Sequence, residues 1–182
     1  MSFILPVKGI FSQLPESCFI APNATIVGDV TAGEECSFWF NAVVRGDVNT
    51  ITLGNRVNVQ DGACIHCTYQ KTKTVIGDDV SIGHNAIVHG CTVEAKVLIG
   101  MGAIVMDNAY IGTGSVIAAG AVILEGTVVP PGTIWAGVPA KQVKTVSPEL
   151  MAGEVERIAK NYLFYSGWFK DLPKEPSDAV GQ

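Results

Sequence analysis

All three histidines of this 182-residue chain lie close together, in the segments "NVQDGACIHCTYQ" and "IGHNAIVHG". They are His66, His84 and His89, and the residues around them are mostly Ile, Val, Ala and Gly. Imidazole is a common zinc ligand, and catalytic zinc typically takes three protein ligands and keeps one position for water. A single histidine is more often a solvated surface or turn residue. Three of them, near an arginine, a glutamine and several acids, indicate a metal site.

The chain around the histidines is a six-residue repeat, with units such as IGDDVS, IGHNAI, IGMGAI, VMDNAY and IGTGSV. Most units begin with Ile, Leu or Val and have a small fifth residue. The fourth residue is often Gly, Asn or Asp, which tolerate positive φ at a turn. Each unit is therefore expected to form a short strand and a sharp corner. Three units close a triangular coil, and coils stack with strands about 4.8 Å apart.

This pattern predicts an all-β fold, a parallel β-helix in which each coil buries its apolar residues against its neighbours. Between residues 14 and 140 nothing shows the 3.6-residue period of a helix. The hexapeptide pattern is that of left-handed β-helix proteins, so residues 1–146 are predicted to form a left-handed parallel β-helix of hexapeptide repeats.

A helix is predicted next. Ser147-Pro148-Glu149 combines a capping hydroxyl, a proline at the first helical position and an acid in the first turn. Apolar residues then recur at helical spacing, at Met151, Val155, Ile158, Tyr162 and Tyr165. We expect a C-terminal α-helix over residues 147–170 packed on the outside of the β-helix, and a flexible tail over residues 171–182.

The repeat also places the histidines. His66 and His89 are both second in their units, three units apart, so they should stack on one face of successive coils, with Arg45 one coil further down the same row. His84 falls at a corner, and Asp61 at the matching corner of the coil below. Five residues separate His84 from His89 across one face, which is about 15 Å. That is too far for bonds of about 2.0–2.1 Å to one zinc ion, so His84 of a neighbouring chain is expected to complete the site.

These residues resemble the γ-class carbonic anhydrase family. The match lies in "RGD" (45–47), "NVQDGACIH" (58–66) and "GHNAIVHG" (83–90), with the spacing H-x17-H-x4-H, and it extends over nearly the whole chain. It implies a lyase that reversibly hydrates CO2 to bicarbonate. It also implies that His66, His84 and His89 bind Zn²⁺, or Fe²⁺ or Co²⁺, at the interfaces of a homotrimer, two from one chain and one from the next.

The resemblance implies roles for further residues. Arg45 and Asp47 would form an intersubunit ion pair, either with a part in catalysis or as an interface salt bridge alone. Gln60 would hydrogen-bond a metal-bound hydroxide. Asp61 would support Arg45 and the interface, and Asn58 would line the site. Tyr162 resembles a tyrosine that approaches the metal in some relatives, although its place in the helical stripe makes packing the alternative.

One departure from the family concerns proton transfer. The family's prototype carries glutamates in an acidic loop and just after the R-G-D segment. Here Val48 follows Asp47, and the loop after His66, "CTYQKTKT", has no acid. We therefore expect metal binding, and any CO2 hydration to be slow and limited by proton transfer.

Two other functions remain open on the sequence alone. The segment "WAGVPAK" resembles the end of hexapeptide acyltransferases that use acyl-coenzyme A, but those enzymes typically use one catalytic histidine as a base. The other alternative is a non-catalytic metal-binding or assembly protein of the same family, which the missing acids favour.

Charge and composition exclude other partners. The net charge is −5 with scattered Lys and Arg, which argues against nucleic acid and anionic membranes. No apolar run approaches the roughly 20 residues of a membrane span. The opening "MSFILPVKG" has too short an apolar run for a signal peptide, so a cytoplasmic location is expected. The five cysteines fit no zinc-binding spacing and are expected to be reduced and mostly buried.

The expected trimer has a surface to bury. The face of Arg45, His66 and His89 also shows outward Val43, Cys64, Ile87, Ile104, Met106, Val122 and Leu124, an apolar strip that a monomer would expose. The other faces carry Thr31, Gly33, Gly77 and Glu94, or Ser37, Asn58, Gln60 and Ser81, and are expected to be far wetter. Threefold closure would bury the apolar strip and form three equivalent sites.

Overall fold

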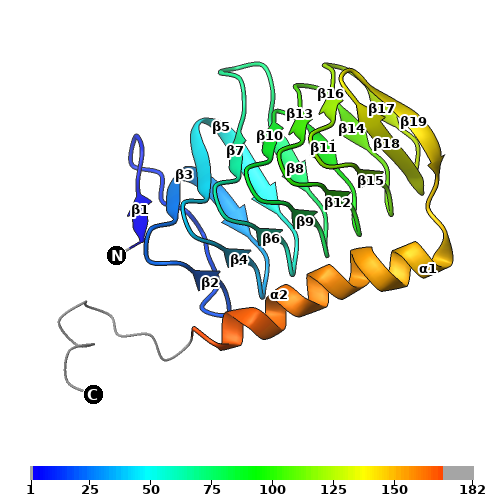
Figure 1. The fold of residues 1–182 in the computed structure, drawn as a ribbon. Coiled ribbons are helices and arrows are strands. Elements are labelled where there is room, and N and C mark those ends of the chain that lie inside the picture. Colours follow the sequence, from blue (N-terminus) through cyan, green and yellow to red (C-terminus); the bar gives the residue numbers. More distant parts are fainter. Residues whose placement is uncertain (1, 170–182) are drawn as a thin grey trace.

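A computed structural model describes residues 2–169, and these residues form a left-handed parallel β-helix with a helix along one side (Figure 1). The strands lie on three faces of a triangular coil. One face, called the histidine face, contains β1 (Phe3–Leu5), the first parts of β3 (Thr25–Ala32) and β5 (Val43–Leu53), β7 (Cys64–His66), β10 (Ile87–His89), β13 (Ile104–Val105) and β16 (Val122–Ile123). The predicted fold class is confirmed.

The other two faces complete the coil. The third face continues β3 and β5 and adds β8 (Thr74–Ile76), β11 (Thr92–Val93), β14 (Tyr110–Ile111) and β17 (Val128–Val129). The helix face contains β2 (Phe19–Ile20), β4 (Ser37–Phe38), β6 (Asn58–Val59), β9 (Ser81–Ile82), β12 (Leu98–Ile99), β15 (Val116–Ile117) and β18 (Thr133–Gly137). The last strand, β19 (Ala140–Thr145), folds back antiparallel to β18 and closes the stack.

The repeat explains the corners and the core. The fourth residue of many units adopts positive φ, including the non-glycine residues Asn41, Arg56 and Asn85 at 56–59°. Inward side chains form columns of aliphatic residues; on the histidine face Ile65 pairs with Val88, which pairs with Val105. These residues are fully buried. The small fifth residues, such as Ala86 and Ala103, are buried beside them and leave room for the large aliphatic residues at the tightly packed axis.

The helix begins where the sequence predicts. The Ser147 hydroxyl accepts a hydrogen bond from the backbone N–H of Leu150, 3.2 Å away, and Pro148 is the first residue of α1 (Pro148–Leu150). The chain continues through a π-helical segment, η1 (Met151–Glu156), into α2 (Arg157–Gly167). Val155 and Ala159 are buried, and the predicted stripe faces the β-helix. The predicted tail, 171–182, lies outside the described residues. No helix within residues 2–169 is long and apolar enough to cross a membrane.

One expectation about the faces is wrong. The face that carries Ser37, Asn58, Gln60 and Ser81 was expected to be wet, but all four side chains are buried. This is the helix face, and the helix runs along it (Figure 1). The polar groups are paired beneath it: Asn58 donates to Ser81 at 2.8 Å, and the Trp39 indole donates to Ser37 at 3.0 Å. A row of polar side chains is therefore not evidence of a solvated face here. Hydrogen bonds among these side chains and Trp39 offset the cost of burying their polar groups.

The cysteines are as expected within the described residues. All five are free, Cys36, Cys67 and Cys91 are buried, and Cys18 and Cys64 are half-buried.

Candidate metal centre

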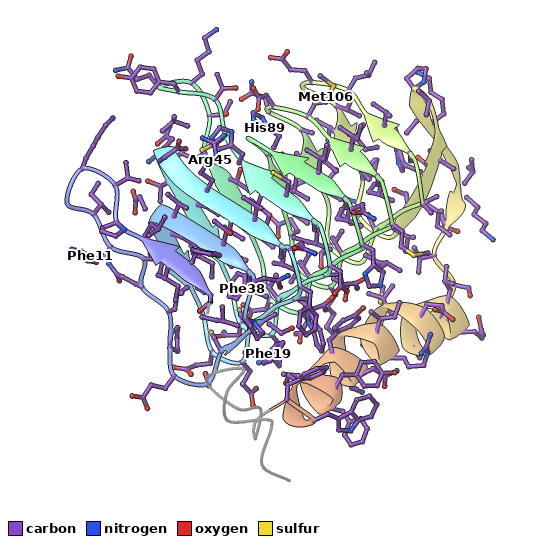
Figure 2. All side chains as sticks on the ribbon, turned by 60° about the vertical axis from the view of Figure 1, so that its left-hand side comes forward. Phe11, Phe19, Phe38, Arg45, His89 and Met106 are labelled. Carbon is purple, nitrogen blue, oxygen red and sulfur yellow. The ribbon has the colours of Figure 1, made fainter. Side chains whose placement is uncertain are left out.

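His66 and His89 lie side by side on successive coils, as the repeat predicts. Strands β7 and β10 pair in parallel with His66 opposite His89, and Nδ1 of His66 is 3.2 Å from Nε2 of His89. Arg45, His89 and Met106 follow one another along the edge of the β-helix opposite the helix (Figure 2). Two nitrogen ligands of one tetrahedral zinc ion, at bonds of about 2.0–2.1 Å, lie about 3.3–3.4 Å apart. The spacing of these two nitrogens fits a shared metal ion.

The carboxylates behind the two rings decide which nitrogens carry protons. Asp47 Oδ1 is 3.0 Å from His66 Nε2, and Asp107 Oδ1 is 2.6 Å from His89 Nδ1. An ionised carboxylate only accepts hydrogen bonds, so each of these ring nitrogens must carry its hydrogen. In neutral imidazoles the two facing nitrogens then present lone pairs to each other. Two lone pairs at 3.2 Å repel unless a cation lies between them, so the donor set itself fits a metal.

Hydrogen bonds keep both carboxylates ionised. Burial opposes ionisation of Asp47, but hydrogen bonds from His66 and Arg45 lower its pKa below the usual value. Burial likewise opposes ionisation of Asp107, and hydrogen bonds from Thr68 and His89 lower its pKa. Both groups therefore act as acceptors at neutral pH.

His84 lies at a different corner and also has a carboxylate beside its ring. It follows β9, between the helix face and the histidine face, and its Nδ1 is 2.9 Å from Asp61 Oδ2. Its Nε2 is the free nitrogen, and the Tyr162 hydroxyl lies 3.4 Å from it. His84 is thus separated from His66 and His89 by the width of the histidine face. Within residues 2–169, no three His, Cys, Asp or Glu side chains gather as metal ligands in a single chain.

Tyr162 combines packing with a contact to His84. Its ring packs edge-on against Trp39, with centroids 5.1 Å apart. Burial, and then the charge of Asp61, raise the pKa of its hydroxyl to about 12. The hydroxyl therefore stays protonated at neutral pH and can donate to His84.

Arg45 and Asp47 form an ion pair within the chain. The resemblance to the carbonic anhydrase family implies a pair between subunits, which stays a prediction. In the single chain Asp47 joins Arg45 to His66, so the R-G-D segment connects directly to a histidine ring. Gly46 allows this close course of the chain, because a Cβ there would collide with the backbone of Asp29.

Gln60 lies beside His84. Asn58 lies two residues before Gln60 and faces the helix on the same row. Both side chains are almost fully buried. Gln60 Nε2 donates to Asn58 Oδ1 at 3.0 Å, so Asn58 orients the Gln60 amide. Gln60, His84 and Tyr162 line a cavity of about 440 Å³ between the helix and the β-helix, and Asn58 is not part of its wall. Asn58 therefore contacts the site through the Gln60 amide.

Sequence reasoning missed three polar residues of the site. Asp107 contacts His89, and the Thr68 hydroxyl donates to Asp107 Oδ2 at 2.5 Å while Thr72 contacts Oδ1 at 3.4 Å. The signal was available for Asp107 alone: Val105 pairs with Val88, which places Asp107 beside Gly90, the residue after His89. The threonines lie in the non-repetitive loop after His66, where the repeat gives no register.

Comparisons with known proteins show the family of this chain. The sequence model described as "Bacterial transferase hexapeptide (six repeats)" matches residues 90–125. A carbonic anhydrase of Geobacillus kaustophilus is 46% identical over 172 residues, covering 94% of this chain and 93% of that protein. Mitochondrial gamma carbonic anhydrase 1 of Arabidopsis thaliana is 38% identical over 86% of this chain, which spans 59% of the length of that protein.

Two solved structures share the fold over nearly the whole chain. A Bacillus cereus protein named as a candidate acetyltransferase is 40% identical, with a TM-score of 0.91 over 94% of this chain and 99% of that chain. A hexapeptide transferase family protein from Anaplasma phagocytophilum is 38% identical, with a TM-score of 0.87 over 92% of this chain and 98% of that chain. On these sequence relatives, this chain belongs to the γ-class carbonic anhydrase-like family of hexapeptide-repeat proteins.

Proposed function

We propose that this protein catalyses the reversible hydration of CO2 to bicarbonate at a divalent metal ion. Its ligands would be His66 and His89 of one chain and His84 of the adjacent chain in a homotrimer. The observation that supports this most directly is the pair of facing nitrogens 3.2 Å apart, each backed by a carboxylate. His84 also has a carboxylate beside Nδ1, and its Nε2 faces the Tyr162 hydroxyl at 3.4 Å.

A bound zinc ion supplies Lewis acidity, which brings the pKa of a water ligand to about 7. The chain's own residues would orient the reactants. The Gln60 amide, fixed by Asn58, retains a free Oε1 that can accept a hydrogen bond from a hydroxyl group in the site. Ile87 and Met106, on the two outward rows that carry the site, provide apolar surface for a nonpolar gas.

The balance of the reaction leaves one proton. CO2 and water give bicarbonate and a proton, which must reach the solvent. Asp47, Asp61 and Asp107 are engaged with the histidines, and the loop after His66 has no acid. We therefore propose that turnover is slow because proton release limits it.

Acyl transfer is the less favoured function. The names of the two structural relatives support it, and so does the hexapeptide sequence model. An acyltransferase base, however, is typically one histidine, and a carboxylate behind that ring would suit it. Acyl transfer is less favoured because it gives no role to two further histidines, or to the pair of rings that face each other at 3.2 Å. A non-catalytic metal-binding protein of the same family would have the same ligands and would differ in activity alone.

Metal analysis followed by a CO2-hydration assay tests the proposal. Protein loaded anaerobically and aerobically with Zn²⁺, Fe²⁺ or Co²⁺ should hold about one ion per chain. His66→Ala should lose the ion and the activity. Tyr110→Phe, which removes an exposed hydroxyl bonded to Glu94 on the third face, should retain both. Full metal occupancy in His66→Ala would refute the ligand set, and a loaded but inactive wild type would favour the non-catalytic alternative.

A further inference from the structure

The carboxylate behind His89 comes from the coil after that ring, whereas the carboxylates beside His66 and His84 come from the coils before them. Asp47 is two residues after Arg45 in the R-G-D segment, and Asp61 is next to Gln60. Asp107 instead follows β13, one coil beyond His89, and reaches back to Nδ1 of that ring at 2.6 Å. This contact leaves Nε2 of His89 as the nitrogen that faces His66.

The Asp107 carboxylate is fixed on its other side by the loop 67–73, between β7 and β8. The Thr68 hydroxyl donates to Oδ2 at 2.5 Å, and the Thr72 hydroxyl lies 3.4 Å from Oδ1. Thr72 is almost fully buried, and its hydroxyl also accepts from the backbone N–H of Thr68 at 2.9 Å. Both carboxylate oxygens thus have partners, and the loop is closed around them.

A glycine after His89 leaves room for the Asp107 carboxylate. Gly90 has φ +56°, and a Cβ at that position would collide with Asp107 Oδ1 and the Thr72 hydroxyl. Thr74 is fully buried; its hydroxyl donates to the His66 carbonyl at 2.7 Å and accepts from the Gly90 N–H at 3.0 Å. Thr74, the first residue of β8 after the loop, therefore connects the backbone of His66 to that of Gly90, the residue after His89.

We propose that Asp107, clamped by Thr68 and Thr72, is a positioning residue that fixes the tautomer and orientation of His89 so that its Nε2 is presented as a metal ligand. The loop 67–73 then braces the metal site and is not a proton-transfer element. The proposal rests on the proposed metal-dependent function. A carboxylate that holds the far nitrogen of a metal-binding imidazole typically changes metal affinity by 10–100-fold.

Zinc affinity, measured by competition with a chelator, tests the role. Asp107→Ala should weaken Zn²⁺ binding by about 10–100-fold and alter the visible absorption of Co²⁺-loaded protein, while the trimer mass stays unchanged. Thr68→Val should cause a smaller loss, and Thr68→Ser, which keeps the hydroxyl, should bind as the wild type does. Lys71→Ala, an exposed residue of the same loop, is the matched control and should change nothing.

The outcomes separate this role from the proposed function. If Asp107→Ala and Thr68→Val bind Zn²⁺ as tightly as the wild type, the positioning role is refuted. If Asp107→Ala does not fold, the Thr68→Val and Thr68→Ser pair decides by the same criterion. If the wild type binds no metal, the proposed function fails, and ¹⁵N NMR of the metal-free protein decides the role of Asp107. A wild-type His89 with its proton on Nδ1, lost in Thr68→Val or Asp107→Ala, supports positioning; a wild-type His89 with its proton on Nε2 overturns it.

Discussion

At the scale of single residues, the three histidines are distinguished by the carboxylates behind their rings. Asp47 and Asp107 accept hydrogen bonds from His66 and His89, and Asp61 lies 2.9 Å from Nδ1 of His84, so a second nitrogen of each ring is directed away from its carboxylate. Such partners fix ring orientation before a metal arrives and raise the basicity of the ligand. Two of these second nitrogens meet within one chain. The third, on His84, faces a tyrosine hydroxyl, which a metal ion would have to displace or share.

A carboxylate outside the site provides the pH prediction. Two hydrogen bonds, of 2.6 and 2.9 Å, join Asp79 to Arg56, and they lower the pKa of Asp79. A folded-state pKa below the unfolded value of about 3.9 stabilises the fold above that pH. The contribution is lost as the pH falls through the lower folded value. Asp79→Asn should therefore reduce the free energy of unfolding at pH 7, by up to about 1 kcal/mol for a half-exposed pair, and its effect should disappear in acid, once the pH falls below the lowered pKa of Asp79.

Urea unfolding of metal-free protein at several pH values measures this difference. Glu125→Gln, which removes one negative charge from an exposed corner, is the control and should show little pH-dependent change. A destabilisation by Asp79→Asn that persisted unchanged in acid would show that the ion pair is not its cause.

At the scale of elements, the strands and corners could be predicted because each residue's place depends on the six-residue period alone. The alignment of His66 with His89 followed from the same period, and so did the corner position of His84. The period could not say which face the helix covers, since an apolar stripe such as that of Val155 and Tyr162 shows that a helix packs but not where. Asn58 and Gln60 are buried and paired because the helix covers their face, so neither feature could be predicted from the period. Thr68 and Thr72 could not be predicted because they lie in a loop without a repeat, whereas the register could have placed Asp107 beside His89.

The loop 67–73 also carries the prediction about proton transfer. With no acid in this loop, small diffusing buffers should accept the proton that CO2 hydration releases. Raising the concentration of imidazole at fixed pH and ionic strength should increase the hydration rate several-fold, as expected when general-base transfer limits a reaction. His66→Ala should show no such increase. A fast rate that does not depend on buffer would mean that another group of the protein carries the proton.

At the scale of the whole molecule, the histidine face is an apolar surface with candidate metal-ligating histidines along both of its edges. His84 lies at one edge, and His66 and His89 lie at the other. The register extends the apolar strip beyond the predicted residues, since β1 pairs with β3, placing Phe3 opposite Thr25 and Leu5 opposite Val27. Phe3 and Leu5 are 57% and 51% exposed, and Leu124 at the far end is 48% exposed. A contiguous apolar face of this kind is typical of an interaction surface. One edge supplies one histidine and the other edge supplies two, so two adjacent chains together would supply three metal ligands.

If the site is shared between chains, two inactive variants can repair each other. His84→Ala keeps an intact His66/His89 edge, and His89→Ala keeps an intact His84 edge. In a ring of three chains that contains both variants, one interface of the three joins the two intact edges. Co-expression with two different tags and purification through both selects such mixed trimers. These should hold about one third of the wild-type metal, whereas each variant alone should hold none.

The pair His66→Ala and His89→Ala is the matched control for this complementation. Both substitutions damage the same edge, because His66 and His89 face each other at 3.2 Å within one chain. No arrangement of these two variants in a ring restores a complete site, so their mixed trimers should stay free of metal. Equal metal content in the two mixtures would contradict a shared site, and so would recovery of metal by a protein that sediments as a monomer at micromolar concentration. Recovery in the first mixture alone is expected, because His84 and the His66/His89 edge lie on opposite sides of the apolar face that threefold closure would bury.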